Sequence, residues 1–138
     1  MPTSQTEVIT YGNSKAIYTQ GDGFIKRRAW DKNGILRSSI TRKTSNSKLH
    51  GKSMWFDAKG MLETVVHYKN NQPHGKHFTY INGILSSSEN YKNGKLHGRC
   101  RMWSHGQLIS DVNYKDGKRH GRLRRWSATG KLLEDRVY

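Results

Sequence analysis

The sequence YKNGKLHGRCRMWSHGQL, residues 91–108, returns 23 positions later as YKDGKRHGRLRRWSATGKL, residues 114–132. Both copies keep a tyrosine, an Asx-Gly pair, a His-Gly pair, a tryptophan five residues after that second glycine, and a leucine after a further glycine. A fixed period of roughly 20 to 50 residues is typical of proteins built from repeated supersecondary units. The repeat therefore determines which fold we expect.

The same pattern extends upstream of these two copies. The His-Gly pairs begin at His50, His74, His97 and His120, with spacings of 24, 23 and 23 residues. An earlier unit, starting at Tyr18, keeps the spacing of the glycines, of Trp30 and of Leu36, but has Phe24-Ile25 in place of His-Gly. The polar, basic stretch TRKTSNSK, residues 41–48, lengthens the loop at the end of this unit.

These observations predict the organisation of the chain. We expect an N-terminal segment or entry strand at 1–17, and a degenerate first repeat with a longer basic loop at 18–49. Four regular repeats follow, at 50–73, 74–96, 97–119 and 120–138. The sequence leaves open whether the N-terminal segment pairs within this chain or with a neighbour.

Each unit is predicted to be a β-hairpin. The pair Asn82-Gly83 is a strong hairpin signal, because both central positions of such a turn need a positive φ. The pair Asn93-Gly94 between two units has the same chemistry, and no window has a helical period. The predicted fold is all-β: an elongated single-layer antiparallel meander of about ten strands, built from about five 23-residue hairpin repeats.

The Tyr-Lys-x-Gly-Lys-x-His-Gly turn, the aromatic strand and the x-Gly-x-Leu turn resemble the MORN (membrane occupation and recognition nexus) repeat. The pattern is most similar to the variant class found in bacterial proteins labelled as antitoxins and expanded in some giant DNA viruses. The resemblance covers residues 50–138 and weakens at 18–49, where His-Gly is lost. It implies an array of β-hairpins used for binding or assembly, without a common catalytic centre.

Side chains alternate along a strand, so the first, third and fifth residues after each His-Gly pair share one face. The fifth position forms an aromatic stripe of Trp30, Phe56, Tyr80, Trp103 and Trp126. The candidate cations for binding a polyanion or a partner are Lys26, Arg28, Lys52, Lys76, Arg99, Arg101, Arg119, Arg122, Arg124 and Arg125. The stripe is interpreted either as packing or as a platform for stacking bases. The cations either contact phosphates or cover the aromatics and pair with carboxylates.

Turn geometry also gives an expected register. With the turn at 82–83, Tyr80 lies opposite Leu85 and Lys76 opposite Glu89; by the same count Arg124 lies opposite Glu134. The other face, which includes Ser53 and Cys100, is then expected to be mostly solvated, with local apolar spots at Trp55, Met102 and Leu123. Asp111 and Asp135 are expected on that other face as well.

Composition favours an anionic partner. The chain has 25 Lys and Arg against 10 Asp and Glu, a net charge of +15. Such a balance attracts nucleic acid, anionic membranes and acidic proteins. Our first hypothesis is a scaffold that binds an acidic protein partner or assembly neighbour, as a structural component of a larger particle such as a virion. The alternative is a sequence-independent binder of nucleic acid or of an anionic membrane surface, and a third hypothesis is an antitoxin.

Catalysis is not expected. The carboxylates are dispersed, and the histidines recur about 9.5 Å apart along the array, too far to share a metal with bonds near 2.0–2.1 Å. They are expected to bond turn backbone or to pack on tyrosines. We therefore predict no enzyme, no cofactor, no metal and no small-molecule substrate. The single cysteine, Cys100, and the lack of a signal-peptide pattern predict an intracellular, cytoplasmic protein, or one within a virion.

Overall fold

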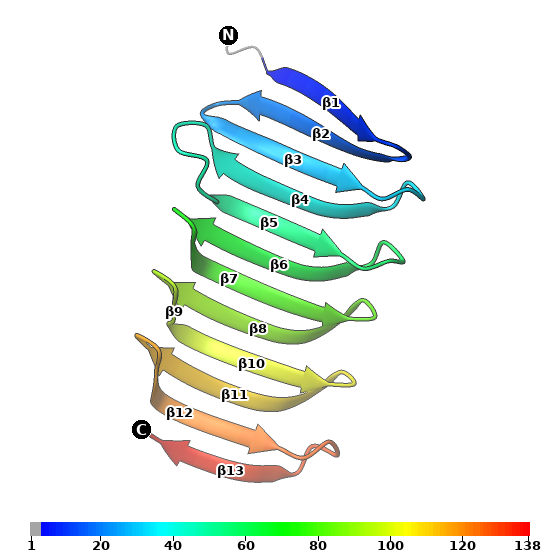
Figure 1. Ribbon diagram of the computed structural model, residues 1–138. Helices are drawn as coiled ribbons and strands as arrows, with labels where there is room; N and C mark the ends of the chain where they lie inside the picture. The colour runs from blue at the N-terminus through cyan, green and yellow to red at the C-terminus, as the bar shows by residue number, and fades with distance from the viewer. Residues whose placement is uncertain (1–3) are drawn as a thin grey trace. The chain divides into compact units, whose positions relative to one another are not determined.

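A computed structural model describes residues 4–138, so residues 1–3 of the N-terminal segment lie outside the described part. The chain is all-β, as predicted: the described residues form thirteen strands and no helix. They fall into two compact units, up to Gln72 and from Pro73. Within each unit the strands follow the order of the chain in one antiparallel layer, which confirms the predicted meander (Figure 1).

In the first unit each strand pairs with the next one along the chain. Its strands are β1 (Gln5–Tyr11), β2 (Ser14–Gly21), β3 (Phe24–Trp30), β4 (Leu36–Lys43), β5 (Gly51–Phe56) and β6 (Leu62–Lys69). The N-terminal segment pairs within the chain, because β1 pairs β2 and β2 pairs β3.

The second unit repeats this plan. Its strands are β7 (Gln72–Ile81), β8 (Ile84–Lys92), β9 (Lys95–Leu96), β10 (Gly98–Ser104), β11 (Gln107–Lys115), β12 (Lys118–Trp126) and β13 (Leu132–Val137). Residues 4–138 form thirteen strands rather than the expected ten because β1 and β2 form an additional hairpin and His97 separates β9 from β10. The turns inside a repeat lie at one end of the strands, and the turns between repeats lie at the other (Figure 1).

Tight turns form where Asx-Gly predicted them. Asn82, Asn93 and Asp116 all have φ of 50°, and the glycine after each has φ between 76° and 82°. Asn and Asp tolerate this left-handed region better than other residues with a side chain, and glycine adopts it freely. The sequence signal is thus explained by backbone conformation.

Each of the five repeat hairpins also contains a β-bulge just before its aromatic residue. Five register shifts lie at Ala29/Trp30, Trp55/Phe56, Thr79/Tyr80, Met102/Trp103 and Arg125/Trp126. Tyr80 faces Leu85 as expected, but one extra residue, Ser86, follows on the returning strand. A bulge of this kind moves all later side chains of that strand to the other face.

The predicted register beyond the bulge is therefore wrong by one residue. Lys76 lies opposite Asn90, not Glu89, and Arg124 lies opposite Asp135, not Glu134. The turn alone predicts a register without an extra residue, but the bulge follows the turn by only a few residues and shifts everything beyond it. Asp111 and Asp135 consequently lie on the face of the cations, not on the face opposite them.

A second irregularity marks the His-Gly pairs. Between the pairs Val112–Leu123 and Tyr114–Arg119, the strand that contains His120-Gly121 has two residues more than its partner. Gly98 and Gly121 have φ of 97° and 74°, which is why glycine is required there. In the first repeat Ile25 holds this place, and β2 and β3 pair without interruption.

Side chains of the neighbouring strand close these His-Gly bulges. The Asn113 amide donates to the Arg122 carbonyl at 3.3 Å, Asn90 donates likewise to the Arg99 carbonyl, and the Thr41 hydroxyl to the Lys52 carbonyl at 3.3 Å. The repeat histidines contact turns, as expected. The backbone N–H of Asn93 donates to His74 Nδ1 at 3.2 Å, and the backbone N–H of Asp116 donates to His97 Nδ1 at 3.4 Å. The bulge is thus a hydrogen-bonded feature of the regular repeats.

The core is small and lies partly on the face that was expected to be solvated. Ser53 and Cys100 are 0% and 9% exposed, so the expectation of solvation was wrong at these positions, while Leu123, expected to be a local apolar spot, is 1% exposed. Cys100 and Leu123 lie on either side of the buried Val112, with which both pair across strands. The aromatic stripe is half-buried rather than buried.

Candidate partner-binding face

We call the side of each unit that presents the first and third residues after the repeat glycine the basic face. In the second unit its central row crosses six strands with Cα atoms paired in turn: Phe78, Ser88, Arg101, Asp111, Arg124 and Asp135. Arginine and aspartate alternate along this row. Cross-strand pairs of opposite charge are the favourable arrangement in a sheet.

Asp111 is the centre of the row and is only 4% exposed. The Arg99 guanidinium donates to both of its oxygens, from Nε at 2.8 and 3.1 Å. Arg101 Nε and Arg124 Nη2 lie 3.5 and 3.7 Å from Asp111 Oδ2. The hydrogen bonds from Arg99, helped by the charges of Arg101 and Arg124, hold the pKa of the Asp111 carboxyl below its ordinary value.

The last hairpin repeats this compensation. Arg122 donates to both oxygens of Asp135, at 2.8 and 2.6 Å, and this contact lowers the pKa of the Asp135 carboxyl. The Arg124 guanidinium also lies 5.5 Å from the ring centre of Trp126. Most of the candidate arginines of the second unit are therefore engaged by its own carboxylates or aromatics.

Two predicted residues lie elsewhere. Arg125 faces the opposite side, where its Nη1 lies 3.8 Å from Glu134 Oε2. Arg119, near the turn between repeats, donates to the Tyr138 hydroxyl at 3.0 Å. Lys76, the first residue after the repeat glycine Gly75, is exposed. The structure thus brings together Arg99, Arg101, Arg122 and Arg124, but not Arg119 and Arg125.

The first unit differs at the same positions. Lys26, Arg28 and Lys52 are exposed, and their side chains form no ion pair or hydrogen bond with any other described residue. Arg28 pairs across strands with Ser39, which stands where Asp111 and Asp135 stand in the second unit. These three cations therefore keep their full charge available to a ligand.

The same cations line an open hollow of about 520 Å³ on the first unit. Its polar lining is completed by hydroxyl side chains, namely Ser4, Thr19, Ser39 and Thr41. Phe24 and Met54 supply apolar wall, and Asp22 is the one carboxylate among the lining residues. A hollow with several cations and hydroxyls has the donors needed to hold an anionic group.

The aromatic stripe gives a mixed picture. The Lys15 ammonium lies 5.0 Å from the Trp30 ring centre, and Arg124 covers Trp126, so two stripe residues are covered by cations. Both tryptophans, with Phe56, Tyr80 and Trp103, remain half-buried. They pack the sheet surface while part of each ring stays open to a partner.

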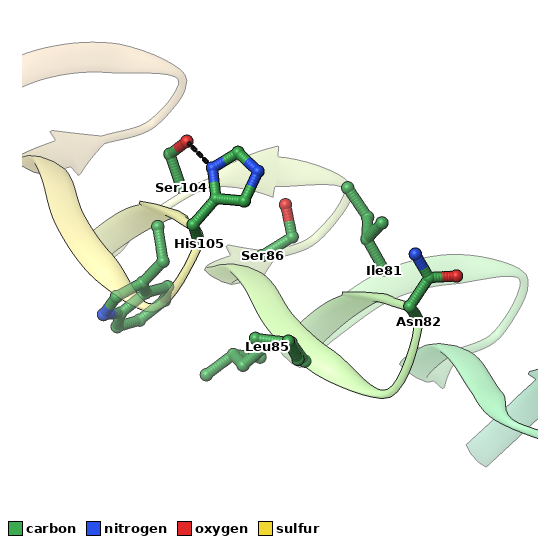
Figure 2. A pocket seen from close by; sticks show the side chains of 8 residues that line it. Ile81, Asn82, Leu85, Ser86, Ser104 and His105 are labelled. Atoms are coloured by element: carbon green, nitrogen blue, oxygen red, sulfur yellow. Dashed lines mark hydrogen bonds between the residues drawn. The ribbon is translucent and has the colours of Figure 1, made fainter. Parts of the chain in front are cut away.

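A separate recess of about 220 Å³ lies at the turns of the second unit. Figure 2 shows Ile81 and Asn82 on one side of it and Ser104 and His105 on the other, with Leu85 and Ser86 between them. Ile81 and Ile84 are 61% and 56% exposed there. The Ser104 hydroxyl and His105 Nδ1, 3.1 Å apart, are hydrogen-bonded to each other. The recess can take an apolar side chain but presents no charge to hold one in place.

Three potentially reactive side chains, those of Cys100, Tyr91 and Glu89, are held by burial or by hydrogen bonds within the protein. Burial raises the pKa of the Cys100 thiol, which makes it a poor nucleophile. Tyr91 donates to Glu89 at 2.8 Å, and burial raises the pKa of this phenol. The hydrogen bond with His77 lowers the pKa of Glu89. Within residues 4–138 no group of three His, Cys, Asp or Glu side chains could hold a metal ion, and no helix there has the length and apolarity to cross a membrane.

Sequence reasoning missed the roles of Asp111 and of the bulge-closing Asn90 and Asn113. The sequence does contain a signal for the two asparagines, because Asn90 and Asn113 are 23 residues apart, which is the period of the repeat. For Asp111, the missing information was the bulge that determines which face it joins.

The hairpins, their repeated bulges and the recurring His-Gly turns define a β-hairpin repeat protein. Residues 49–70, which span β5 and β6, match the family described as MORN repeat variant. This match confirms the resemblance predicted from the sequence at one of the regular repeats. No curated protein matches the chain.

Proposed function

We propose that this protein is a non-enzymatic interaction scaffold that binds an acidic protein partner through the basic face of its first unit. The observation that carries the proposal is the cluster of Lys26, Arg28 and Lys52, which are exposed and form no ion pair with a described carboxylate. Exposed charges of one sign steer a partner of the opposite sign and speed association.

The second unit supports the choice of a protein partner over nucleic acid. A sequence-independent nucleic-acid binder neutralises several phosphates along a strand, so it needs a continuing series of available cations. In the second unit, Asp111 and Asp135 occupy Arg99 and Arg122 by hydrogen bonds to both carboxylate oxygens. A localised acidic segment needs only the first-unit cluster.

The test is a binding titration of the full chain at about 0.15 M salt with a fluorescent acidic peptide and with mixed-sequence single-stranded DNA. We expect the peptide to bind, and the triple variant Lys26→Gln, Arg28→Gln, Lys52→Gln to lose binding. The matched control removes three charges from exposed turn lysines, Lys32→Gln, Lys59→Gln and Lys131→Gln, and should bind normally. Tighter binding of DNA, with a steep dependence on salt, would overturn the proposal and favour the nucleic-acid alternative.

A further inference from the structure

The hollow on the first unit has more hydrogen-bond donors than a carboxylate can use. Lys26 and Thr41 are paired across β3 and β4, and Thr41 bonds to the Lys52 backbone on β5. Neighbouring strands lie about 4.8 Å apart, so the two lysines start about 9.6 Å apart on either side of Thr41. Arg28 follows Lys26 on the same face, about 6.7 Å along the strand. All three side chains line the hollow.

A phosphate monoester matches this set of donors. It has a charge of about −1.5 to −2 at neutral pH and three strong acceptor oxygens, whereas a carboxylate has a single charge and two oxygens. Three cations and the hydroxyls of Thr19 and Ser39 line the space, while the Thr41 hydroxyl donates to the Lys52 carbonyl. A planar guanidinium such as that of Arg28 binds two phosphate oxygens at once.

The arrangement fits one phosphate rather than a series of them. On the next hairpin of the first unit Met54 stands where a third-position cation would be, opposite Ser39 and Val65. In the second unit the corresponding arginines face Asp111 and Asp135. Among the first- and third-position cations of the basic face, the three that form no ion pair or hydrogen bond with another described residue, Lys26, Arg28 and Lys52, thus lie in one cluster.

We propose that this hollow binds the phosphate of a phosphoserine or phosphothreonine within an acidic segment of the partner. The inference rests on the proposed function and specifies its partner. Phosphorylation of that segment then controls assembly, because the cluster discriminates the phosphorylated from the unmodified form. The acidic residues around the phosphate supply general attraction to the basic face.

The experiment compares one fluorescent acidic peptide with a single phosphothreonine, its unphosphorylated twin, and single-stranded DNA of equal length, each titrated with the full chain. One charge-assisted hydrogen bond adds about 1.5–3 kcal/mol, so phosphorylation should tighten binding at least about tenfold. The triple variant of Lys26, Arg28 and Lys52 to Gln should lose this preference, and the triple turn-lysine control should keep it.

A second variant tests the same site by adding charge. Ser39→Asp places a carboxylate opposite Arg28, as Asp111 is placed opposite Arg101, and should abolish the preference while the circular dichroism spectrum stays that of the native sheet. Equal binding of both peptides would overturn the phosphate inference and leave the proposed function intact. Binding of neither peptide would overturn both. Tighter binding of DNA, or of vesicles rich in anionic lipid, than of the phosphopeptide would also overturn the inference.

Discussion

Arg28 in the first repeat and Arg101 and Arg124 in the last two hold the same position, but their surroundings differ. Arg101 and Arg124 are half-buried opposite Asp111 and Asp135, while Arg28 is exposed opposite Ser39. The same residue type at the same place in a repeat is therefore structural in one region and available in another. The cross-strand partner decides which.

The two regions also enter their hairpins differently. The last two repeats have a His-Gly bulge closed by Asn90 or Asn113, and the first repeat runs straight through Ile25. Bulges bend a strand and increase its twist. The first repeat lacks both the His-Gly bulge and a carboxylate opposite its third-position arginine, so its basic face is the less constrained one.

The largest expected effect comes from Asp111→Ser, which gives the second unit the partner that Arg28 has. Removing this buried carboxylate leaves three arginines without their shared counter-ion, and breaking a buried pair costs about 3–5 kcal/mol. The arginines are 34–47% exposed, so we expect a loss of about 3 kcal/mol in the free energy of unfolding, measured with urea. A loss below about 1 kcal/mol would show that the row is not a stabilising feature.

A smaller effect is expected from removing a bulge glycine. Gly98→Ala forces a side chain onto a residue with φ of 97°, which costs about 1–2 kcal/mol of unfolding free energy. The matched control in the first repeat is Gly21→Ala: Gly21 does not have a positive φ, and an added Cβ would meet Ser4 at an ordinary 3.7 Å. Equal losses in urea unfolding for both variants would refute a special role of the bulge.

A matched pair of arginine substitutions measures the central difference. Arg28→Gln should change the free energy of unfolding by less than about 0.5 kcal/mol, as is usual for an exposed residue. Arg101→Gln should cost about 1 kcal/mol, since Arg101 is half-buried beside Asp111. Thermal unfolding of both variants against the native chain would contradict the comparison if Arg28→Gln proved the more harmful.

The smallest effect is a dependence on pH. The pKa of the Asp111 carboxyl is lowered in the folded chain, so its contribution is complete above the unfolded value of about 3.9 and is lost as the pH falls through the folded value. The stability advantage of the native chain over Asp111→Ser should be constant above about pH 5 and shrink below about pH 4. Urea unfolding at pH 7, 4 and 3 would refute this if the advantage grew on acidification.

Much of the fold could be predicted from the sequence, because its signals are local. Asn82-Gly83 and Asn93-Gly94 require positive φ, and the recurring histidines and leucines indicate the repeat. The register could not be predicted, because the bulge before Tyr80 leaves no unambiguous residue in the sequence. One extra residue was enough to place Asp111 beside Arg101, and with it to change which cations of the candidate site are available.

The most direct test of this difference is an NMR titration of the 15N-labelled chain with the acidic phosphothreonine peptide, following the arginine Nε–Hε signals. The account predicts that the Arg28 signal shifts with peptide while the signals of Arg101 and Arg124 keep their positions, because both guanidinium groups lie beside Asp111. Shifts of Arg101 and Arg124 with an unmoved Arg28 signal would contradict it.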